Sequence, residues 1–373
     1  MRFPEFKGEW NKTEIANIIS NKSAKYIPNT LEHILDIELE NMNEGGGITT
    51  NLSDSANQRS TKNCFYIGNV LFGKLRPYLN KIWLASKKGV CSSEIWVLSS
   101  DTLVPSFLYS FCQTSHFSHL ANTTCGSKMP RADWDLMSSS LINYPSMDEQ
   151  KKIGNLLITL EKRICLQRKT IEDLEKVCLF QSDGLLKLDP IVGTPLSKIL
   201  FETNKYAKKD EGFVHVTLSK EGITPKTDRY NRDFLVKSED KKYKITELND
   251  ICYNPANLKF GVISLNLFGK AIFSPIYVTF KVKEGYSPFF ISLLLTNQRF
   301  INYIRRYEQG TVYERMAVNP SDFLKAKLVI PDFKRQIVDS KKIEILKEKI
   351  IKEKEILSAL IMVKKYLLSH LFI

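Results

Sequence analysis

The chain lacks the long apolar runs that mark membrane-spanning proteins. Its apolar stretches, such as Phe289–Leu295, are far shorter than the roughly 20 residues that cross a bilayer. Charged residues interrupt the apolar ones throughout Met1–Trp10, so we expect no signal peptide in this segment. These absences predict a protein with no membrane partner.

Cysteine pairs at metal-binding or redox spacing are also missing. The seven cysteines are an odd number, lie scattered along the chain and include no C-x-x-C pair. A disulfide framework or a zinc site is therefore not expected. This usage is typical of a protein in a reducing cytoplasm.

Catalytic and cofactor motifs are absent as well. No G-x-x-x-x-G-K-[ST] occurs, so a P-loop ATPase is not expected. A methyltransferase that acts on the amino group of a DNA base needs an Asn/Asp-Pro-Pro-aromatic tetrad, and Asn254–Asn257 lacks its second proline and its aromatic. The carboxylates of Glu239–Lys241 with Asp233 read as a charged surface loop, and no further ligand accompanies His116 and His119. We expect no metal, no cofactor and no catalytic residue.

Positive charge is in excess. The chain of 373 residues has 54 lysines and arginines against 41 acidic residues, a net charge of +13. Such an excess favours a polyanionic partner, either nucleic acid or an anionic membrane surface. The composition favours nucleic acid, and a lysine-rich solubilising surface is the alternative interpretation.

The sequence repeats itself with an offset of half its length. Pro145 is followed by Gln150 and a long helical pattern, and Pro331 is followed by Gln336 and a second one. Both the prolines and the glutamines are 186 residues apart. An internal repeat of this kind decides the architecture, so we expect two copies of one unit.

The helical parts of the repeat carry apolar residues at steps of three and four. This spacing is the a/d pattern of a coiled-coil seam. Each helix of about 38 residues, at about 1.5 Å per residue, extends for about 57 Å and cannot bury a seam alone. We expect the two to pack as an antiparallel pair whose seam, or partner-docking face, includes Ile153, Leu157, Leu160, Ile164, Gln167, Ile171, Leu174, Ile343, Leu346, Ile350, Glu353, Leu357 and Leu360.

The remaining parts of the chain form two globular halves of similar plan. Each has alternating strand patterns followed by a helical pattern, which predicts an α/β (α+β) fold with a pseudo-twofold internal repeat. The predicted strands include Glu94–Leu98 and Ile276–Phe280, and the predicted helices are Pro105–Leu120 and Ser287–Tyr303. The expected domains are 1–147 and 188–332 (globular), with helical spacers at 148–187 and 333–373.

Basic and aromatic residues gather in loops that differ between the two halves. Arginine can pair with guanine, lysine neutralises phosphate and tyrosine can donate to phosphate. Gly45–Gly47 is interpreted as a flexible loop. Any single basic residue could instead be a solvated surface charge. Our candidates for DNA binding are Lys74, Arg76, Tyr78, Lys81, Lys128, Arg131, Asn254, Lys259, Arg306, Tyr313 and Arg315.

Two segments carry a family resemblance. The opening Arg2–Trp10 and the helix start from Pro145 through Glu149 to Ile153 resemble those of type I restriction–modification specificity subunits. The second helix start departs from the pattern, because Arg335 precedes its glutamine where Glu149 precedes the first. The target-recognition loops are the variable part of that family, so no contact residue carries over by motif.

The resemblance implies a non-catalytic subunit with two target-recognition domains and two helical spacers. Each domain would recognise one half of a split double-stranded DNA site, and the helices would dock two methyltransferase subunits. Motor–nuclease subunits would complete the restriction enzyme. The alternatives are a nuclease or methyltransferase acting alone and a coiled-coil scaffold that does not bind DNA.

Overall fold

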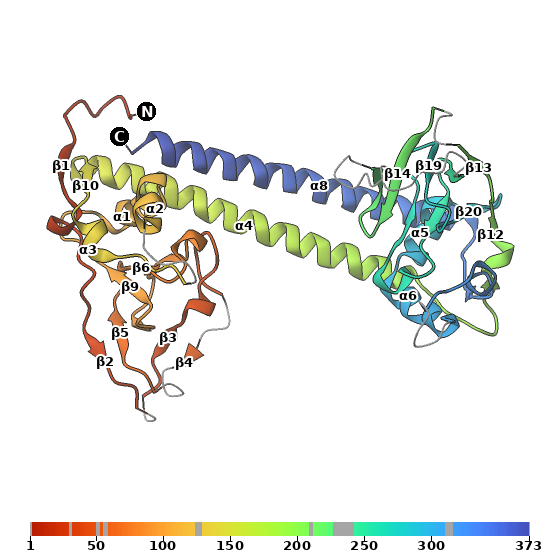
Figure 1. Ribbon diagram of the computed structural model, residues 1–373, viewed down its shortest axis with the longest axis horizontal. Helices are drawn as coiled ribbons and strands as arrows, with labels where there is room; N and C mark the ends of the chain where they lie inside the picture. Colours follow the sequence, from red (N-terminus) through yellow and green to blue (C-terminus); the bar gives the residue numbers. More distant parts are fainter. Residues whose placement is uncertain are drawn as a thin grey trace. The chain divides into compact units, whose positions relative to one another are not determined.

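The computed structural model describes residues 2–29, 32–49, 53–54, 59–123, 129–208, 212–226, 242–309 and 316–372. The chain forms two compact units, which are treated separately below. Unit 1 comprises residues 1–169 and 354–373, and unit 2 comprises residues 170–353. Each unit therefore contains one globular half and part of each long helix (Figure 1).

The two long helices are α4 (Met147–Leu185) and α8 (Phe333–His370). In unit 1, Ile153 and Leu157 near the start of α4 share a core with Leu367 near the end of α8 and Leu371 just after it. In unit 2, residues near the end of α4 pack with residues near the start of α8, and this cluster includes Leu174, Cys178, Ile343, Leu346 and Ile350. The start of one helix meets the end of the other in each unit, which confirms the antiparallel pairing.

The globular part of unit 1 contains a five-stranded sheet of order β2-β5-β8-β3-β4, a three-stranded sheet β7-β6-β9 and the pair β1-β10. Its strands are β1 (Asn11–Glu14), β2 (Lys25–Tyr26), β3 (Leu35–Ile37), β4 (Ser53–Asp54), β5 (Lys62–Phe65), β6 (Val70–Gly73), β7 (Ile82–Leu84), β8 (Gly89–Cys91), β9 (Ile95–Leu98) and β10 (Leu141–Tyr144). Its helices are α1 (Pro105–Phe111), α2 (Ser115–Asn122) and α3 (Trp134–Ser138).

The globular part of unit 2 contains a five-stranded sheet of order β13-β16-β19-β14-β15, a four-stranded sheet β12-β20-β17-β18 and the pair β11-β21. Its strands are β11 (Thr194–Pro195), β12 (Leu200–Glu202), β13 (Tyr206–Ala207), β14 (Val214–Ser219), β15 (Gly222–Pro225), β16 (Tyr243–Thr246), β17 (Ile251–Tyr253), β18 (Ile263–Leu265), β19 (Ala271–Phe273), β20 (Val278–Val282) and β21 (Lys327–Leu328). Its helices are α5 (Pro288–Leu295), α6 (Gln298–Ile304) and α7 (Pro320–Phe323).

The two halves share one topology. Each five-stranded sheet takes its strands in the same relative chain order, and each contains a single parallel pair, β3 with β8 and β14 with β19. The central strand of the smaller sheet pairs with the strand that follows it and with a later one, as β6 does with β7 and β9 and β17 does with β18 and β20. The predicted α/β duplication is therefore confirmed.

The helix predicted over Pro105–Leu120 is in fact two helices, and so is the helix predicted over Ser287–Tyr303. Thr114 caps α2 by accepting from the Phe117 amide, and Asn297 caps α6 by accepting from the Arg299 amide. A capping side chain satisfies the free amides of a new helix start, so the chain turns at these two positions. Periodicity alone missed these caps.

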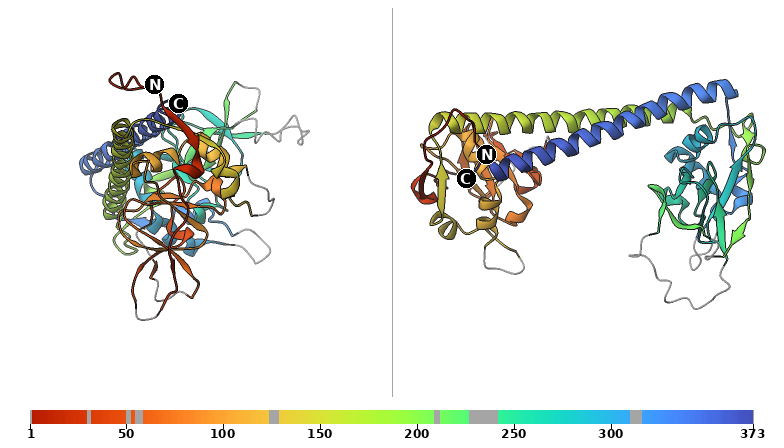
Figure 2. Two further views of the ribbon diagram at one scale, coloured as in Figure 1. Left: turned by 90° about the vertical axis from the view of Figure 1, so that its left-hand side faces the viewer. Right: turned by 90° about the horizontal axis from the view of Figure 1, so that it is seen from above.

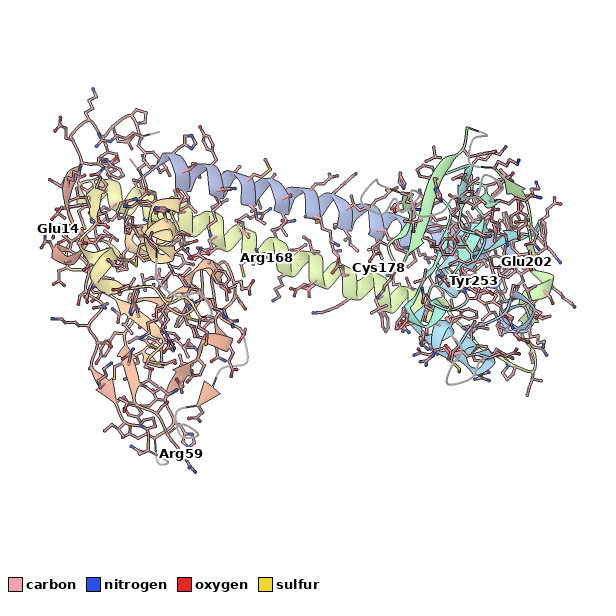
Figure 3. All side chains as sticks on the ribbon, viewed as in Figure 1. Glu14, Arg59, Arg168, Cys178, Glu202 and Tyr253 are labelled. Atoms are coloured by element: carbon pink, nitrogen blue, oxygen red, sulfur yellow. The ribbon has the colours of Figure 1, made fainter. Side chains whose placement is uncertain are left out.

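Buried aromatic rings fill both globular cores. In unit 1, Phe72 packs edge-on against Phe117, with ring centroids 5.1 Å apart. In unit 2, Tyr253 stacks on Phe323 at 4.8 Å and donates a hydrogen bond to the carbonyl of Val318 (Figure 3 labels Tyr253). A buried tyrosine needs a partner for its hydroxyl group, and Val318 provides it. Each half therefore has a core of its own.

Candidate functional site

A buried glutamine joins each long helix to its globular half. In unit 1, Gln150 accepts a hydrogen bond from the Val104 amide at 2.9 Å and donates to the Pro145 carbonyl at 3.0 Å. In unit 2, Gln336 accepts from the Ser287 amide at 2.9 Å and donates to the carbonyl of its own preceding proline at 2.9 Å.

The amides of Val104 and Ser287 belong to the capping residues of α1 and α5. The repeated proline–glutamine spacing therefore marks a contact, or joint, that occurs in both units. In each, the glutamine side chain accepts a hydrogen bond from an amide at the start of a short helix and holds that helix against the long one.

The joints differ at the neighbouring residue. Glu149 is buried and forms a bidentate salt bridge with Arg2. The Arg2 Nε and Nη2 atoms donate to the two carboxylate oxygens at 2.8 Å and 2.7 Å, which ties the N-terminal segment to α4. Arg335 in unit 2 instead pairs with Asp339 one turn further along its own helix, at 2.7 Å. Burial raises the pKa of Asp339, but hydrogen bonds from Arg335 and Lys342 outweigh this and leave it below its usual value.

The predicted basic loop of unit 1 is brought together by backbone contacts. Leu75 forms a β-bridge with Arg131, and the Arg76 amide donates to the carbonyl of Pro130 at 2.8 Å. The guanidinium of Arg131 is held by Glu94, with its Nε atom 3.0 Å from a carboxylate oxygen. This hydrogen bond raises the pKa of Arg131. Lys74, Arg76 and Arg131 thus lie on one edge of the domain.

The two other candidates of this loop have different surroundings. Tyr78 is exposed, whereas the ammonium of Lys81 donates to the carbonyl of Leu39 at 2.6 Å. The glycine run interpreted as flexible has positive φ at all three residues and is bonded to this loop, since the Gly45 amide donates to the Leu79 carbonyl at 3.2 Å. These bonds make the glycine run part of the loop's support.

In unit 2, Asn254 and Lys259 lie in one turn and Arg306 lies after α6. Asn254 is buried and accepts from the Ala256 amide at 3.1 Å, so the segment that resembles a methyltransferase tetrad is a turn. The ammonium of Lys259 lies 5.1 Å from the ring centre of Phe260. The guanidinium of Arg306 lies 4.0 Å from the ring centre of Tyr303.

Three candidates for DNA binding, Lys128, Tyr313 and Arg315, lie outside the described residues, as do Asp233 and Glu239–Lys241. Of the paired histidines, His116 contacts the carbonyl of Leu141 at 3.2 Å. Within the described ranges, no group of three or more His, Cys, Asp or Glu side chains is placed to hold a metal ion.

The predicted seam residues are either buried or half-buried. Buried members are Ile153, Leu157, Ile164, Gln167, Ile171, Ile343 and Ile350. Leu160, Leu174, Leu346, Glu353, Leu357 and Leu360 are half-buried. Side chains that fill the seam are covered by the two helices, so a docking surface must use other residues.

A polar network in unit 1 was missed by sequence reasoning. The hydroxyl of Tyr109 donates to Glu161 at 2.9 Å, and the ammonium of Lys364 lies 3.2 Å from the same oxygen and 2.7 Å from Gln113. Burial, and then the Glu161 charge, raise the pKa of Tyr109. The network ties α1, α4 and α8 together. Its only sequence signal is Lys364 in a seam position where α4 has Cys178.

Each five-stranded sheet buries one lysine at a matching place. Lys62 in β5 lies 3.0 Å from Asp36, which is fully buried, and also contacts Glu38. Lys244 in β16 donates to Asn204 at 2.9 Å and lies 3.5 Å from Glu202. Burial raises the pKa of Asp36 and lowers that of Lys244. Lys62 thus links β5 to β3, and Lys244 links β16 to β12 and to the segment that follows β12.

Unit 2 also has a partly exposed ion pair between β20 and the turn before β17. Lys281 of β20 donates to Glu247, which lies in the turn before β17. This hydrogen bond lowers the pKa of Glu247 and raises that of Lys281. The pair holds β20 of the four-stranded sheet to the turn that follows β16 of the five-stranded sheet.

Exposed apolar residues also occur on the long helices. In unit 2 a hollow of about 430 Å³ lies between α4 and α8, and Cys178, Leu179, Ile350 and Ile351 are among its lining residues (Figure 3 labels Cys178). Phe180, next to this hollow in the sequence, is 81% exposed. The residue at the same place in the repeat, 186 positions later, is the exposed Tyr366.

Comparison with known proteins finds a family model that matches part of this chain. Residues 8–176 match the model of the type I restriction modification DNA specificity domain. This part of the chain is therefore similar to that domain. The matched residues cover the globular half of unit 1 and most of α4, including the first glutamine joint.

One curated protein is similar to part of this chain. The chain is 29% identical over 143 residues to the type I restriction enzyme EcoDI specificity subunit of Escherichia coli, and the match covers 38% of this chain and 31% of the relative. The chain therefore spans less than a third of the length of this curated relative.

Two solved structures resemble this chain over nearly their whole length. The type I restriction–modification S subunit from M. genitalium has a TM-score of 0.60 at 16% identity, covering 100% of this chain and 99% of that one. A chain from a structure of complex assembly and conformational transition in a type I R-M system has a TM-score of 0.58 at 13% identity, covering 98% and 97%. These likenesses concern the fold.

Among the described residues, no helix combines the length and the apolarity that crossing a membrane requires.

Proposed function

We propose that this chain is the DNA-recognition subunit of a type I restriction–modification complex and binds a bipartite site in double-stranded DNA. The observation that carries the proposal is the duplication of one α/β domain, each copy joined to its own long helix by the same glutamine bonds. Two copies of one scaffold with different loop residues suit two different half-sites, because side-chain identity discriminates base edges. In this proposal, residues 1–147 and 188–332 are the target-recognition domains.

The basic loops are proposed to contact the DNA. In the first domain these are the loops of Lys74, Arg76, Tyr78, Lys81, Lys128 and Arg131, and in the second those of Asn254, Lys259, Arg306, Tyr313 and Arg315. Arg131 would release Glu94 and bind a base or phosphate instead, because its side chain is half exposed in the pair with Glu94. The net charge of +13 supports binding to a polyanion.

Two methyltransferase subunits are proposed to dock on the paired helices. Phe180 and Tyr366 occupy the same place in the repeat, so one kind of partner could bind twice. Exposed aromatic residues are enriched at interfaces. The chain itself would be non-catalytic and cytoplasmic, and motor–nuclease subunits would join the full complex.

The DNA proposal is tested with the chain co-purified with its methyltransferase subunits. The complex should methylate and protect one split sequence at one spacing, and lose binding steeply as salt rises. Changing either half-site, or the spacing by one base pair, should abolish specific binding. If the complex binds all duplexes equally, or if the chain alone cleaves or methylates DNA, the proposal is wrong.

The docking proposal is tested by counting subunits with native mass spectrometry. Phe180→Ala and Tyr366→Ala should each leave one methyltransferase subunit bound, and the double variant none. Arg168→Ala, at an exposed polar position of α4, is the matched control and should leave two (Figure 3 labels Arg168). Retention of both subunits by the double variant would place docking elsewhere.

A further inference from the structure

A short turn with an exposed aromatic ring occurs at the same place in both domains. In unit 1 the turn η4 (Pro77–Leu79) joins β6 to β7, and in unit 2 the turn η8 (Leu258–Phe260) joins β17 to β18. η4 packs beside α2 and η8 beside α6, which are corresponding helices (Figure 2 gives further views). Tyr78 is 58% exposed and Phe260 is 64% exposed.

Each ring is held outward by a buried neighbour. Pro77 is buried before Tyr78, and Leu258, 1% exposed, anchors the turn that carries Phe260. Backbone bonds close the turns, since the Asn80 amide donates to the Pro77 carbonyl at 2.9 Å and the Gly261 amide to the Leu258 carbonyl at 2.8 Å. Both turns end in the left-handed conformation, with φ of 48° at Asn80 and 80° at Gly261. The exposure is therefore built into a rigid turn.

Positive charge accompanies both rings. Arg76 is exposed directly before Pro77, and the ammonium of Lys259 lies over the ring of Phe260. The side chain of Lys220 reaches the same turn, with its Cε atom 3.8 Å from where a Cβ on Gly261 would lie. A rigid aromatic face beside cations matches a base beside its phosphates, because bases stack on rings and phosphates pair with cations. The rings lie on the globular domains and not on the long helices that carry the aromatic residues proposed for subunit docking.

We propose that Tyr78 and Phe260 are DNA-contacting residues, each of which stacks on a base at a locally unstacked step of its own half-site. This inference rests on the proposed function. Apolar and aromatic side chains that enter a base step separate the two bases, so the ring replaces the lost stacking partner. The duplication places one such ring in each domain, and sequence reasoning had included Tyr78 but not Phe260.

Binding of the complete methyltransferase complex to its duplex tests this inference. Phe260→Ala should weaken binding by about 5- to 150-fold, the range seen for loss of a base–aromatic stack, with the salt dependence unchanged. Lys259→Ala should lower the salt slope by about one unit instead. Leu267→Ala, at a residue 69% exposed in the same domain, is the matched control and should bind as wild type. Phe260→Trp should retain binding.

A second readout locates the ring on the DNA. 2-Aminopurine placed at each half-site position, except the methylated adenine, should change emission at one step per half-site when wild type binds. Phe260→Ala should remove the change in one half-site and Tyr78→Ala in the other.

Three outcomes would overturn the inference: binding of Phe260→Ala equal to that of Leu267→Ala, an unaltered emission pattern, or loss of a methyltransferase subunit. Failure of the wild-type complex to bind any split site would instead refute the proposed function.

Discussion

Gly154 of α4 lies in close contact with α1 of the globular domain. A Cβ atom added there would lie 2.2 Å from Ser106 Oγ, 2.7 Å from Ser106 Cβ and 2.9 Å from the amide nitrogen of Phe107. The Ser106 hydroxyl could rotate away, but Ser106 Cβ and the Phe107 amide nitrogen are held in place by the backbone of α1. Gly154→Ala therefore has to push α1 off α4.

The magnitude follows from two opposing effects. Overpacking of a tight contact costs about 1–3 kcal/mol, and replacing glycine by alanine inside a helix returns up to about 1 kcal/mol. We expect Gly154→Ala to destabilise unit 1 by about 1–2 kcal/mol. Gly184, in the same helix, has nothing within 4 Å of its added Cβ. Gly184→Ala is therefore the matched control and should be neutral or slightly stabilising.

Tryptophan fluorescence during urea unfolding measures this effect in unit 1 selectively. All four tryptophans, at positions 10, 83, 96 and 134, belong to unit 1. Trp10 also packs against Phe107 of α1, with ring centroids 6.2 Å apart. Ser106→Gly removes two of the three clashing atoms, so the double variant should recover part of the loss as a coupling above about 0.5 kcal/mol. A Gly154→Ala protein as stable as Gly184→Ala would refute the close contact.

Four further predictions concern buried and paired polar groups. Gln150→Ala should destabilise unit 1 by about 1–3 kcal/mol, because a capping amide of α1 loses its acceptor, and tryptophan-monitored unfolding measures this. Gln336→Ala should do the same in unit 2, seen as faster hydrogen exchange at the start of α5, and equal exchange would contradict the joint. Lys62→Met should cost about 3–5 kcal/mol by leaving the Asp36 carboxylate buried without its cation, and adding Asp36→Asn should restore much of it. The pKa of Glu247 is lowered in the folded state, so its contribution to stability is present above its unfolded pKa near 4.5 and is lost as the pH falls through the lower folded value. Glu247→Gln should flatten this acid dependence of hydrogen exchange in β16 and β17, and an unchanged profile would show that the pair contributes nothing.

The glutamine contacts at the helix starts show which features of the fold could be predicted from local sequence. The positions of Pro145, Gln150, Pro331 and Gln336 predicted two equivalent helix starts, and the seam spacing predicted two long antiparallel helices. The proline–glutamine spacing and the apolar seam spacing are both regular patterns. Such patterns can be read from the sequence without knowing the contacts of the rest of the chain. The glutamines' partners were not predictable, since Val104 lies 46 residues away from Gln150.

The loops show the opposite case. Arg131 looked like a free basic residue, yet it pairs with Glu94, which lies 37 residues away. Asn254 and Phe260 stand in one turn, but only the fold buries the first and exposes the second. The sequence by itself determined the duplication, the helical seam and the positive charge, because each is a regular pattern or a sum over the chain. The tertiary structure decided which loop side chains are paired, buried or presented outward, because that depends on partners distant in sequence.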